Sequence, residues 1–166
     1  ARSPLADGDS ITFYNSDSTL SSQFGFNIGG SLILGVNGSG PYTISKAPGD
    51  LRFLSAAGAV SITWSDKLTF DGFRPGGLGN GGVVTVASDL TGEITSSFTN
   101  NRSGAGGSRG GAVNVSGNLN GGISGSFSNN STDDGAGNGG PGGAVYVGGN
   151  LTGDISGSFT GNSAGI

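Results

Sequence analysis

The sequence predicts an all-β fold, a right-handed parallel β-helix (β-solenoid) of about five to six coils. Three observations lead to this prediction. A 21-residue unit occurs three times, at 81–101, 110–130 and 142–162; each unit ends in Phe-x-x-Asn; and apolar and polar residues alternate within it. Apolar residues that recur in fixed columns are typical of solenoids, because each coil buries its apolar side against its neighbours.

The alternation within a unit has the period of a half-buried strand. Every second residue from the leucine onward is apolar or small, and the residues between them are mostly polar. A helix is the alternative, since Leu, Ile and Phe also recur at every fourth position, but the intervening Gly, Ser and Thr are poor helix formers. The predicted inward columns are Leu90, Leu119 and Leu151; Ile94, Ile123 and Ile155; and Phe98, Phe127 and Phe159.

Parallel pairing of successive coils would turn each column into a ladder with ~4.8 Å per rung. The phenylalanines are then expected to stack. Asn101, Asn130 and Asn162 form a further column at the end of each unit. Asparagine side chains bond to backbone groups in turns and tolerate left-handed conformations, so we expect an amide ladder at a corner of the coil. A ligand-binding role for these asparagines is the less favoured alternative.

One domain is predicted over the whole chain, 1–166. Its expected parts are a candidate N-terminal cap at 1–28, irregular coils at 29–80 and three regular coils at 81–166, with loops at 102–109 and 131–141. Because only these loops vary in length between units, we expect them to bulge from one corner and to bury nothing.

Weaker echoes of the repeat occur in the irregular part. The segments 29–34 and 58–62 resemble the start of the last unit, at 142–147, and 24–27 reads as a fourth Phe-x-x-Asn. One coil for each of these segments is therefore expected.

Composition excludes several classes of function. The chain contains no cysteine, no histidine and no methionine, which removes disulfides, nucleophile–histidine pairs and most transition-metal sites. No run of about 18 apolar residues is present, so no membrane span is predicted. A net charge of −4 and a pI near 4.4 argue against a nucleic-acid partner. The cysteine-free composition fits an extracellular protein that is held together by hydrogen-bonded ladders.

Carboxylates are the remaining candidates for chemistry. Glu93 and Asp154 share an outward column, but Gly122 lies between them, and such spacing limits repulsion on an acidic surface. Asp133 and Asp134 are weak candidates for calcium, without the register of calcium-binding β-rolls. We therefore predict no catalytic residue, no cofactor and no enzymatic activity.

Two motifs carry a resemblance to a known family. The tetrapeptide Gly-Gly-Ala-Val at 110–113 and 142–145 is followed in the same coil by Phe-x-x-Asn at 127–130 and 159–162. This pairing, over residues 81–162, resembles the GGA(I/L/V) and FxxN repeats of chlamydial polymorphic outer-membrane proteins. The passengers of that family are surface-exposed β-helices secreted as autotransporters, several of them adhesins. The resemblance implies a rod-like protein at an extracellular or outer-membrane surface.

The expected function is that of an extracellular structural or adhesive protein. Few residues follow Asn162, so we expect an open last coil and self-association through the solenoid ends into a filament. A host or cell-surface receptor or a glycan is the other expected partner. The alternatives are a polysaccharide lyase or hydrolase and an ice-binding solenoid. Two outward columns come close to the flat array that ice binding needs: Thr91, Asn120 and Thr152; and Thr95, Ser124 and Ser156. A third column, Thr85, Asn114 and Tyr146, breaks this flatness.

Overall fold

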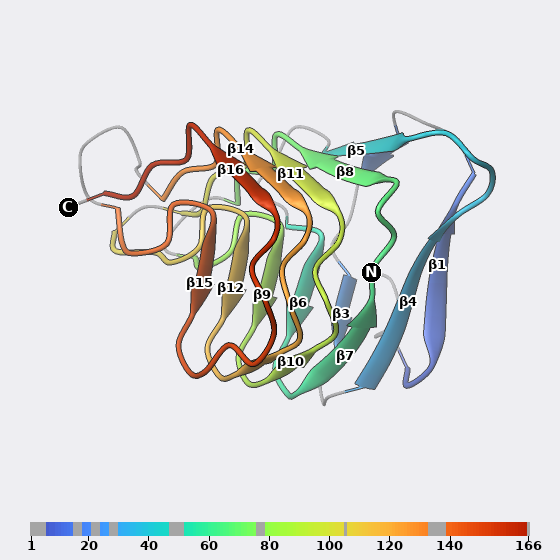
Figure 1. The fold of residues 1–166 in the computed structure, drawn as a ribbon, viewed down its shortest axis with the longest axis horizontal. Helices are drawn as coiled ribbons and strands as arrows, with labels where there is room; N and C mark the ends of the chain where they lie inside the picture. Colours follow the sequence, from blue (N-terminus) through green and yellow to red (C-terminus); the bar gives the residue numbers. More distant parts are fainter. Residues whose placement is uncertain are drawn as a thin grey trace.

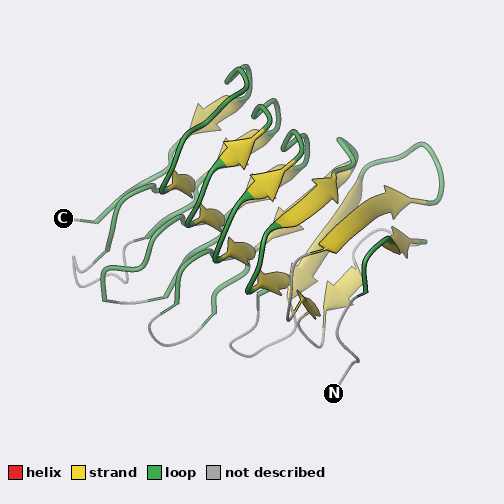
Figure 2. Cartoon of the chain, turned by 90° about the horizontal axis from the view of Figure 1, so that it is seen from below, coloured by secondary structure: helices red, strands yellow, loops and turns green. Residues whose placement is uncertain are grey.

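Three parallel sheets wound from successive coils make up the protein. The computed structural model describes residues 6–14, 18–20, 24–26, 30–46, 52–75, 79–104, 106–132 and 139–165. Within these ranges it has sixteen strands and no helix. From β1 to β12, each strand pairs in parallel with the strand three places further along the chain, and β14 pairs with β16. The three sheets form the three sides of a solenoid (Figure 1, Figure 2). The predicted parallel β-solenoid is confirmed. Its right-handed winding, the usual hand of parallel crossovers, stays a prediction.

The strands are short, and each coil contributes one strand to each sheet, except that the last coil joins sheet A only through the bridge between Leu119 and Leu151. Sheet A contains β1 (Asp9–Phe13), β4 (Gly30–Val36), β7 (Val60–Thr63), β10 (Leu90–Thr91) and β13 (Leu119–Asn120). Sheet B contains β2 (Ser18–Leu20), β5 (Tyr42–Lys46), β8 (Leu68–Asp71), β11 (Ser97–Thr99), β14 (Ser126–Ser128) and β16 (Ser158–Thr160). Sheet C contains β3 (Phe24–Phe26), β6 (Leu54–Ala56), β9 (Val84–Val86), β12 (Val113–Val115) and β15 (Val145–Val147).

The core lies between the three sheets and consists of the inward residues of every strand. Alternation decides which residues these are: β7 and β8 each bury their first and third residues and leave the second and fourth accessible. One buried cluster extends through the coils, from Leu32 and Leu34 at one end to Ile123 and Phe127 near the other. Because each coil is narrow, this cluster is continuous along the axis of the solenoid, as in other repeat folds.

The Gly-Gly-Ala motif shapes the corner that leads into sheet C. Gly110 has a φ of 66°, a left-handed conformation that glycine adopts without strain. A side chain at Gly111 would collide with the backbone of Gly143 in the next coil, so only glycine allows the coils to approach here. Ala112 and Val113 then both donate their N–H groups to the carbonyl oxygen of Ala144, at 2.8 and 3.1 Å.

The N-terminal segment supplies the first strand of each sheet. Within 1–28, considered above as a cap, β1 pairs with β4, β2 with β5 and β3 with β6, all in parallel. The strands of the first coil therefore pair with the edge strands of the second coil in all three sheets.

The described residues of the irregular part contribute strands to all three sheets, but the weaker sequence echoes of the repeat lie in other sheets than the resemblance suggests. The segments 29–34 and 58–62 resemble the start of the last unit, which holds β15 of sheet C, whereas β4 and β7 lie in sheet A. Val60 pairs with Leu90, and the true counterpart of Val84 in that coil is Leu54. Likewise, the apparent Phe-x-x-Asn at 24–27 includes β3 of sheet C, whereas the true motif begins in sheet B.

The corners between sheets B and C bury more than the sequence suggests. Ser103, Ser108 and Thr132 are at most 4% exposed, although they lie in the predicted loops 102–109 and 131–141. Ser103 donates its N–H to Ser131 at 3.1 Å, and Thr132 donates to Ser163 at 3.1 Å, so coil pairing continues beyond the asparagine. The expectation that these loops bury nothing is wrong for these residues, because stacked backbones enclose small polar side chains.

Candidate functional surfaces

The asparagine column forms a hydrogen-bonded ladder inside the corner after sheet B. Asn101 donates its backbone N–H and its Nδ2–H to Oδ1 of Asn130, at 3.1 and 3.0 Å, and Asn130 repeats both bonds to Asn162. The Nδ2 group of Asn130 also donates to the carbonyl oxygen of Phe98 at 3.0 Å. Asn101 and Asn130 are buried. The ladder satisfies backbone groups of its neighbours, so these amides have a structural role.

The ladder continues towards the N-terminus in altered form. Asn101 accepts the backbone N–H of Phe73 at 2.9 Å, so Phe73 occupies the asparagine position of the preceding coil. Its side chain is buried and contributes apolar contact instead of an amide.

The phenylalanine column stacks as predicted. The rings of Phe98 and Phe127 are 4.9 Å apart with 8° between their planes, and those of Phe127 and Phe159 are 4.9 Å apart with 4° between their planes. Phe70 extends the stack to the preceding coil at 5.3 Å. This separation is that of neighbouring strands, so each ring lies directly above the next.

The leucine and isoleucine columns are also in register. Leu90 pairs with Leu119, and bridges join Leu119 to Leu151, Ile94 to Ile123 and Ile123 to Ile155. All of the predicted inward ladders therefore exist in the structure.

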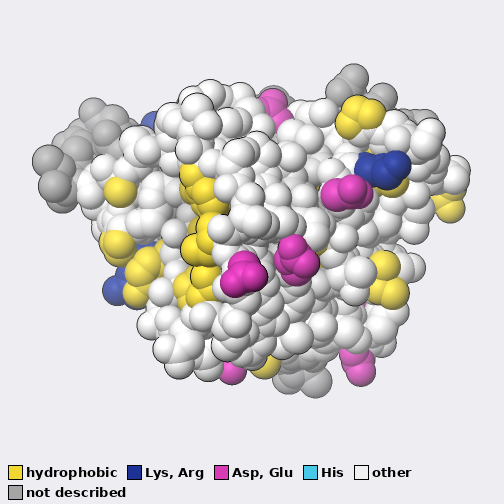
Figure 3. All heavy atoms as spheres, in the orientation of Figure 1, with side chains coloured by type: hydrophobic (Ala, Val, Ile, Leu, Met, Phe, Trp, Pro, Cys, Tyr) yellow, Lys and Arg dark blue, Asp and Glu magenta, His cyan; other side chains and the backbone are white. Residues whose placement is uncertain are grey.

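The last coil leaves the end of these ladders open. Ile155 is 60% exposed and Phe159 43%, whereas Ile123 and Phe127 in the preceding coil are 3% and 0% exposed. Figure 3 shows a band of hydrophobic side chains at the end of the molecule that the last coil occupies. The backbone N–H of Asn162 has no acceptor among the described residues, whereas the backbone N–H of Asn130 donates to Oδ1 of Asn162.

A second polar ladder precedes the leucine column. The N–H of Asn118 donates to Oδ1 of Asp89 at 2.7 Å, and the N–H of Asn150 donates to Oδ1 of Asn118 at 2.8 Å. The signal for it is in the sequence, since Asp or Asn stands directly before the leucine in every unit, at the point where the coil turns into sheet A.

The carboxylates that the structure describes do not converge. A side chain at Gly122 would touch the backbone of Asp154 on one side and the side chain of Glu93 on the other, which places this glycine between the two acids. Both acids are exposed, so no apolar pocket sets one apart as acid and the other as base. The described residues contain no group of three or more Asp or Glu that could hold a metal ion. Asp133 and Asp134, the weak candidates for calcium, lie outside the described residues.

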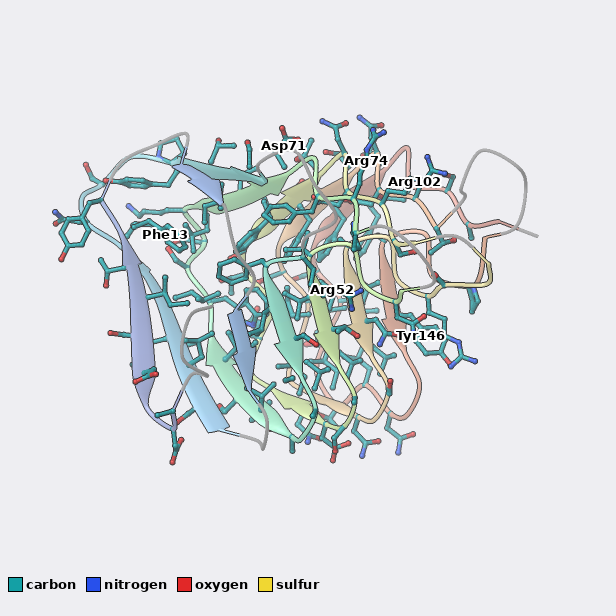
Figure 4. The ribbon with its side chains drawn as sticks, turned by 180° about the vertical axis from the view of Figure 1, so that it is seen from behind. Phe13, Arg52, Asp71, Arg74, Arg102 and Tyr146 are labelled. Atoms are coloured by element: carbon teal, nitrogen blue, oxygen red, sulfur yellow. The ribbon has the colours of Figure 1, made fainter. Side chains whose placement is uncertain are left out.

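Three of the described arginines lie at two separate places on the surface. Arg74 and Arg102 follow Phe73 and Asn101 on consecutive coils and lie along the same edge in Figure 4. Arg109 lies over the ring of Tyr146, with 4.9 Å from its guanidinium carbon to the ring centroid, a cation–π contact on the outer side of sheet C. This contact joins the end of the loop 102–109 to the next coil.

Two other polar groups have perturbed surroundings. Burial lowers the pKa of the Arg52 guanidinium, which lies beside Gly79. Oδ1 of Asn114 is buried without a hydrogen-bond partner, while Nδ2 of the same side chain donates to the hydroxyl of Thr85 at 3.1 Å. Neither group joins a cluster of acids or nucleophiles, so neither indicates a catalytic site.

Comparison with known proteins yielded no match among protein-family models, curated proteins or solved structures. In the part of the chain that the structure describes, no helix is long and apolar enough to span a membrane.

Proposed function

We propose that the protein is an extracellular structural or adhesive component of a cell surface, acting as a rigid β-solenoid rod without catalytic activity. The rigid part of this proposal rests on the ladders, because aligned phenylalanines and bonded asparagines connect consecutive coils. The surface location rests on the cysteine-free composition and on the resemblance to autotransporter passengers.

The observation that carries the proposal furthest is the open last coil. Exposed Ile155 and Phe159, with the open N–H of Asn162, match the groups that bind the next coil elsewhere in the solenoid. At the opposite end, β1 is the edge strand of sheet A among the described strands, with Ile11 and Phe13 only partly buried. Stacking of one copy on the next would bury both ends, and because this contact is head to tail, its product is a filament.

Sedimentation of the 1–166 chain tests self-association. We expect the sedimentation coefficient to rise with concentration and negative-stain images to show rods. Ile155→Lys and Phe159→Lys should keep the chain monomeric, because a buried lysine at the junction would lose its hydration. The matched control is Ile33→Lys, since Ile33 is 49% exposed on the side of β4 rather than at an end. A wild-type chain that stays monomeric at tens of micromolar would contradict the filament.

The adhesive part of the proposal places the contacts in the loops. The loop 102–109 ends in the cation–π contact between Arg109 and Tyr146, which lies on the outer surface of the solenoid. Binding to cells or glycan arrays should weaken in Arg109→Ser and persist in Ser116→Ala. Incubation with acidic polysaccharides should release no new reducing or unsaturated ends, since the proposal includes no lyase or hydrolase activity.

A further inference from the structure

The outward face of sheet B carries two parallel columns of short polar side chains. Strand register aligns them across five successive coils. The first column consists of Thr43, Thr69, Ser97, Ser126 and Ser158, and the second of Ser45, Asp71, Thr99, Ser128 and Thr160. Nine of these ten side chains bear a hydroxyl group, and none is buried. We call this surface the hydroxyl face.

The hydroxyl face is a two-dimensional lattice. Along the solenoid its rungs repeat at the strand spacing, which the 4.9 Å ring separations of the phenylalanines directly beneath also show. Along each strand the two columns are two residues apart, or about 6.7 Å. Figure 1 shows β8, β11, β14 and β16 side by side on one side of the solenoid.

The side chains of this lattice hold one another in place. The hydroxyl of Ser158 donates to that of Ser126 at 3.0 Å, and the hydroxyl of Ser128 donates to that of Thr99 at 3.3 Å. Asp71, the one charged member, accepts a hydrogen bond from Asn100 at 2.9 Å and stands towards the N-terminal side of the column. Serine and threonine have few rotamers to lose, so ordering water against them costs little side-chain entropy.

The other two sides of the solenoid lack such a lattice in their described parts. On sheet A, the column beside Thr91, Asn120 and Thr152 contains Glu93 and Asp154 and includes the exposed Ile33. On sheet C, the column of Thr85 and Asn114 ends in Tyr146, which is covered by Arg109. The face considered for ice from the sequence is thus interrupted by charge, and the hydroxyl face lies on a different sheet.

We propose that the hydroxyl face of sheet B binds ice. A lattice of hydroxyls can hold a layer of water whose positions repeat with the rungs, and such a layer can join the surface of a growing crystal. Each water-mediated bond is weak, but equal bonds repeated in register on a rigid support add together. None of the ten side chains is aromatic, so the face lacks the stacking surface that would favour the sugar rings of a crystalline polysaccharide.

Thermal hysteresis, together with adsorption of fluorescently labelled protein to a single ice crystal, tests the proposal. The wild-type chain should adsorb to ice and depress the freezing point below the melting point. Ser126→Tyr and Thr99→Tyr place a bulky ring in the middle of the lattice, so both variants should lose most of the hysteresis. Thr91→Tyr makes the same change on sheet A and should keep it. Circular dichroism and the melting temperature should show that all three variants are folded.

Several results would overturn the proposal. These are a wild-type chain that neither adsorbs to ice nor shows hysteresis, an equal loss in Thr91→Tyr, and adsorption to crystalline cellulose without adsorption to ice. The outcome is independent of filament formation, because Ile155→Lys changes the last coil outside sheet B and should retain ice adsorption.

Discussion

Oδ1 of Asn162 accepts two hydrogen bonds from Asn130, one from its backbone N–H at 2.9 Å and one from its Nδ2 group at 3.0 Å. A single side-chain oxygen thus binds both the main chain and the side chain of the coil before it. The same pair of bonds joins Asn101 to Asn130, so the arrangement repeats from coil to coil.

Replacing Asn130 by aspartate tests the direction of these bonds. The Nδ2 group donates to the carbonyl oxygen of Phe98 and to Oδ1 of Asn162, so an oxygen in its place would face two acceptors and would need a proton. The pKa of the carboxyl group that Asn130→Asp introduces should therefore lie, in the folded variant, above the unfolded value of about 3.9. We expect a loss of about 3–5 kcal/mol in the free energy of unfolding at neutral pH.

The pH dependence follows from that direction. Because the folded-state pKa is raised, the protonated form stabilises the variant fully below the unfolded pKa, and this stability is lost as pH rises through the folded pKa. Urea unfolding of Asn130→Asp at several pH values should therefore show recovery towards the wild type in acid. Asn129→Asp makes the same change at an exposed neighbour and should show neither effect. Equal destabilisation of Asn130→Asp at every pH would contradict the assigned bonds.

The phenylalanine stack should make a large contribution to stability. Phe127 is fully buried between Phe98 and Phe159, so Phe127→Ala should leave a cavity and lower the free energy of unfolding by about 3–5 kcal/mol. Ser126→Ala, on the outward side of the same strand, should be near neutral. An unchanged melting temperature in Phe127→Ala would mean that the ring is not enclosed.

The second glycine of the Gly-Gly-Ala motif should not tolerate even a methyl group. A Cβ atom at Gly111 would overlap backbone atoms of Gly143 and Ser131, which cannot move as a flexible side chain can. Gly111→Ala should therefore cost about 1–3 kcal/mol or more. Gly40→Ala is the control, because nothing lies within 4 Å of its Cβ position. Equal melting temperatures of Gly111→Ala and Gly40→Ala would contradict the close approach of the coils at Gly111.

Thr132 should stabilise a corner that the sequence predicts to be a free loop. Its buried hydroxyl donates to the carbonyl oxygen of Gly140 and accepts the N–H of Gly165 at 3.2 Å. Thr132→Val keeps the shape but leaves both partners unsatisfied, so we expect a loss of about 1–3 kcal/mol. The exposed Thr160→Val should change the free energy of unfolding much less. Equal values in urea titrations would show that the hydroxyl of Thr132 is solvated.

The regular coils could be predicted from the sequence because three units carry the same frame. Phe98, Phe127 and Phe159 lie at the same place in each unit, and parallel stacking then follows from the strand period. The irregular coils could not be placed as well. Short glycine-rich echoes such as 58–62 recur in more than one sheet, and without the full frame they do not tell which side of the coil a strand belongs to.

The surfaces were harder to predict than the core. Inward residues must be apolar, whereas outward columns are limited only by water and therefore carry a weak signal. The sequence shows the column Asp89, Asn118 and Asn150 directly before the leucines. The hydrogen bonds between these residues depend on the geometry of the corner, which the sequence does not reveal. The hydroxyl face required the register of β5 and β8, where the sequence has no complete repeat.

Amide hydrogen exchange at the three asparagines tests the central claim, that Phe-x-x-Asn joins the coils in register, most directly. The backbone N–H groups of Asn101 and Asn130 donate to the Oδ1 atom of the asparagine in the next coil. The N–H group of Asn162 has no acceptor among the described residues. In a dilute solution of the 1–166 chain, the backbone amide hydrogens of Asn101 and Asn130 should exchange slowly, and that of Asn162 should exchange rapidly. Rapid exchange at all three asparagines would contradict the account.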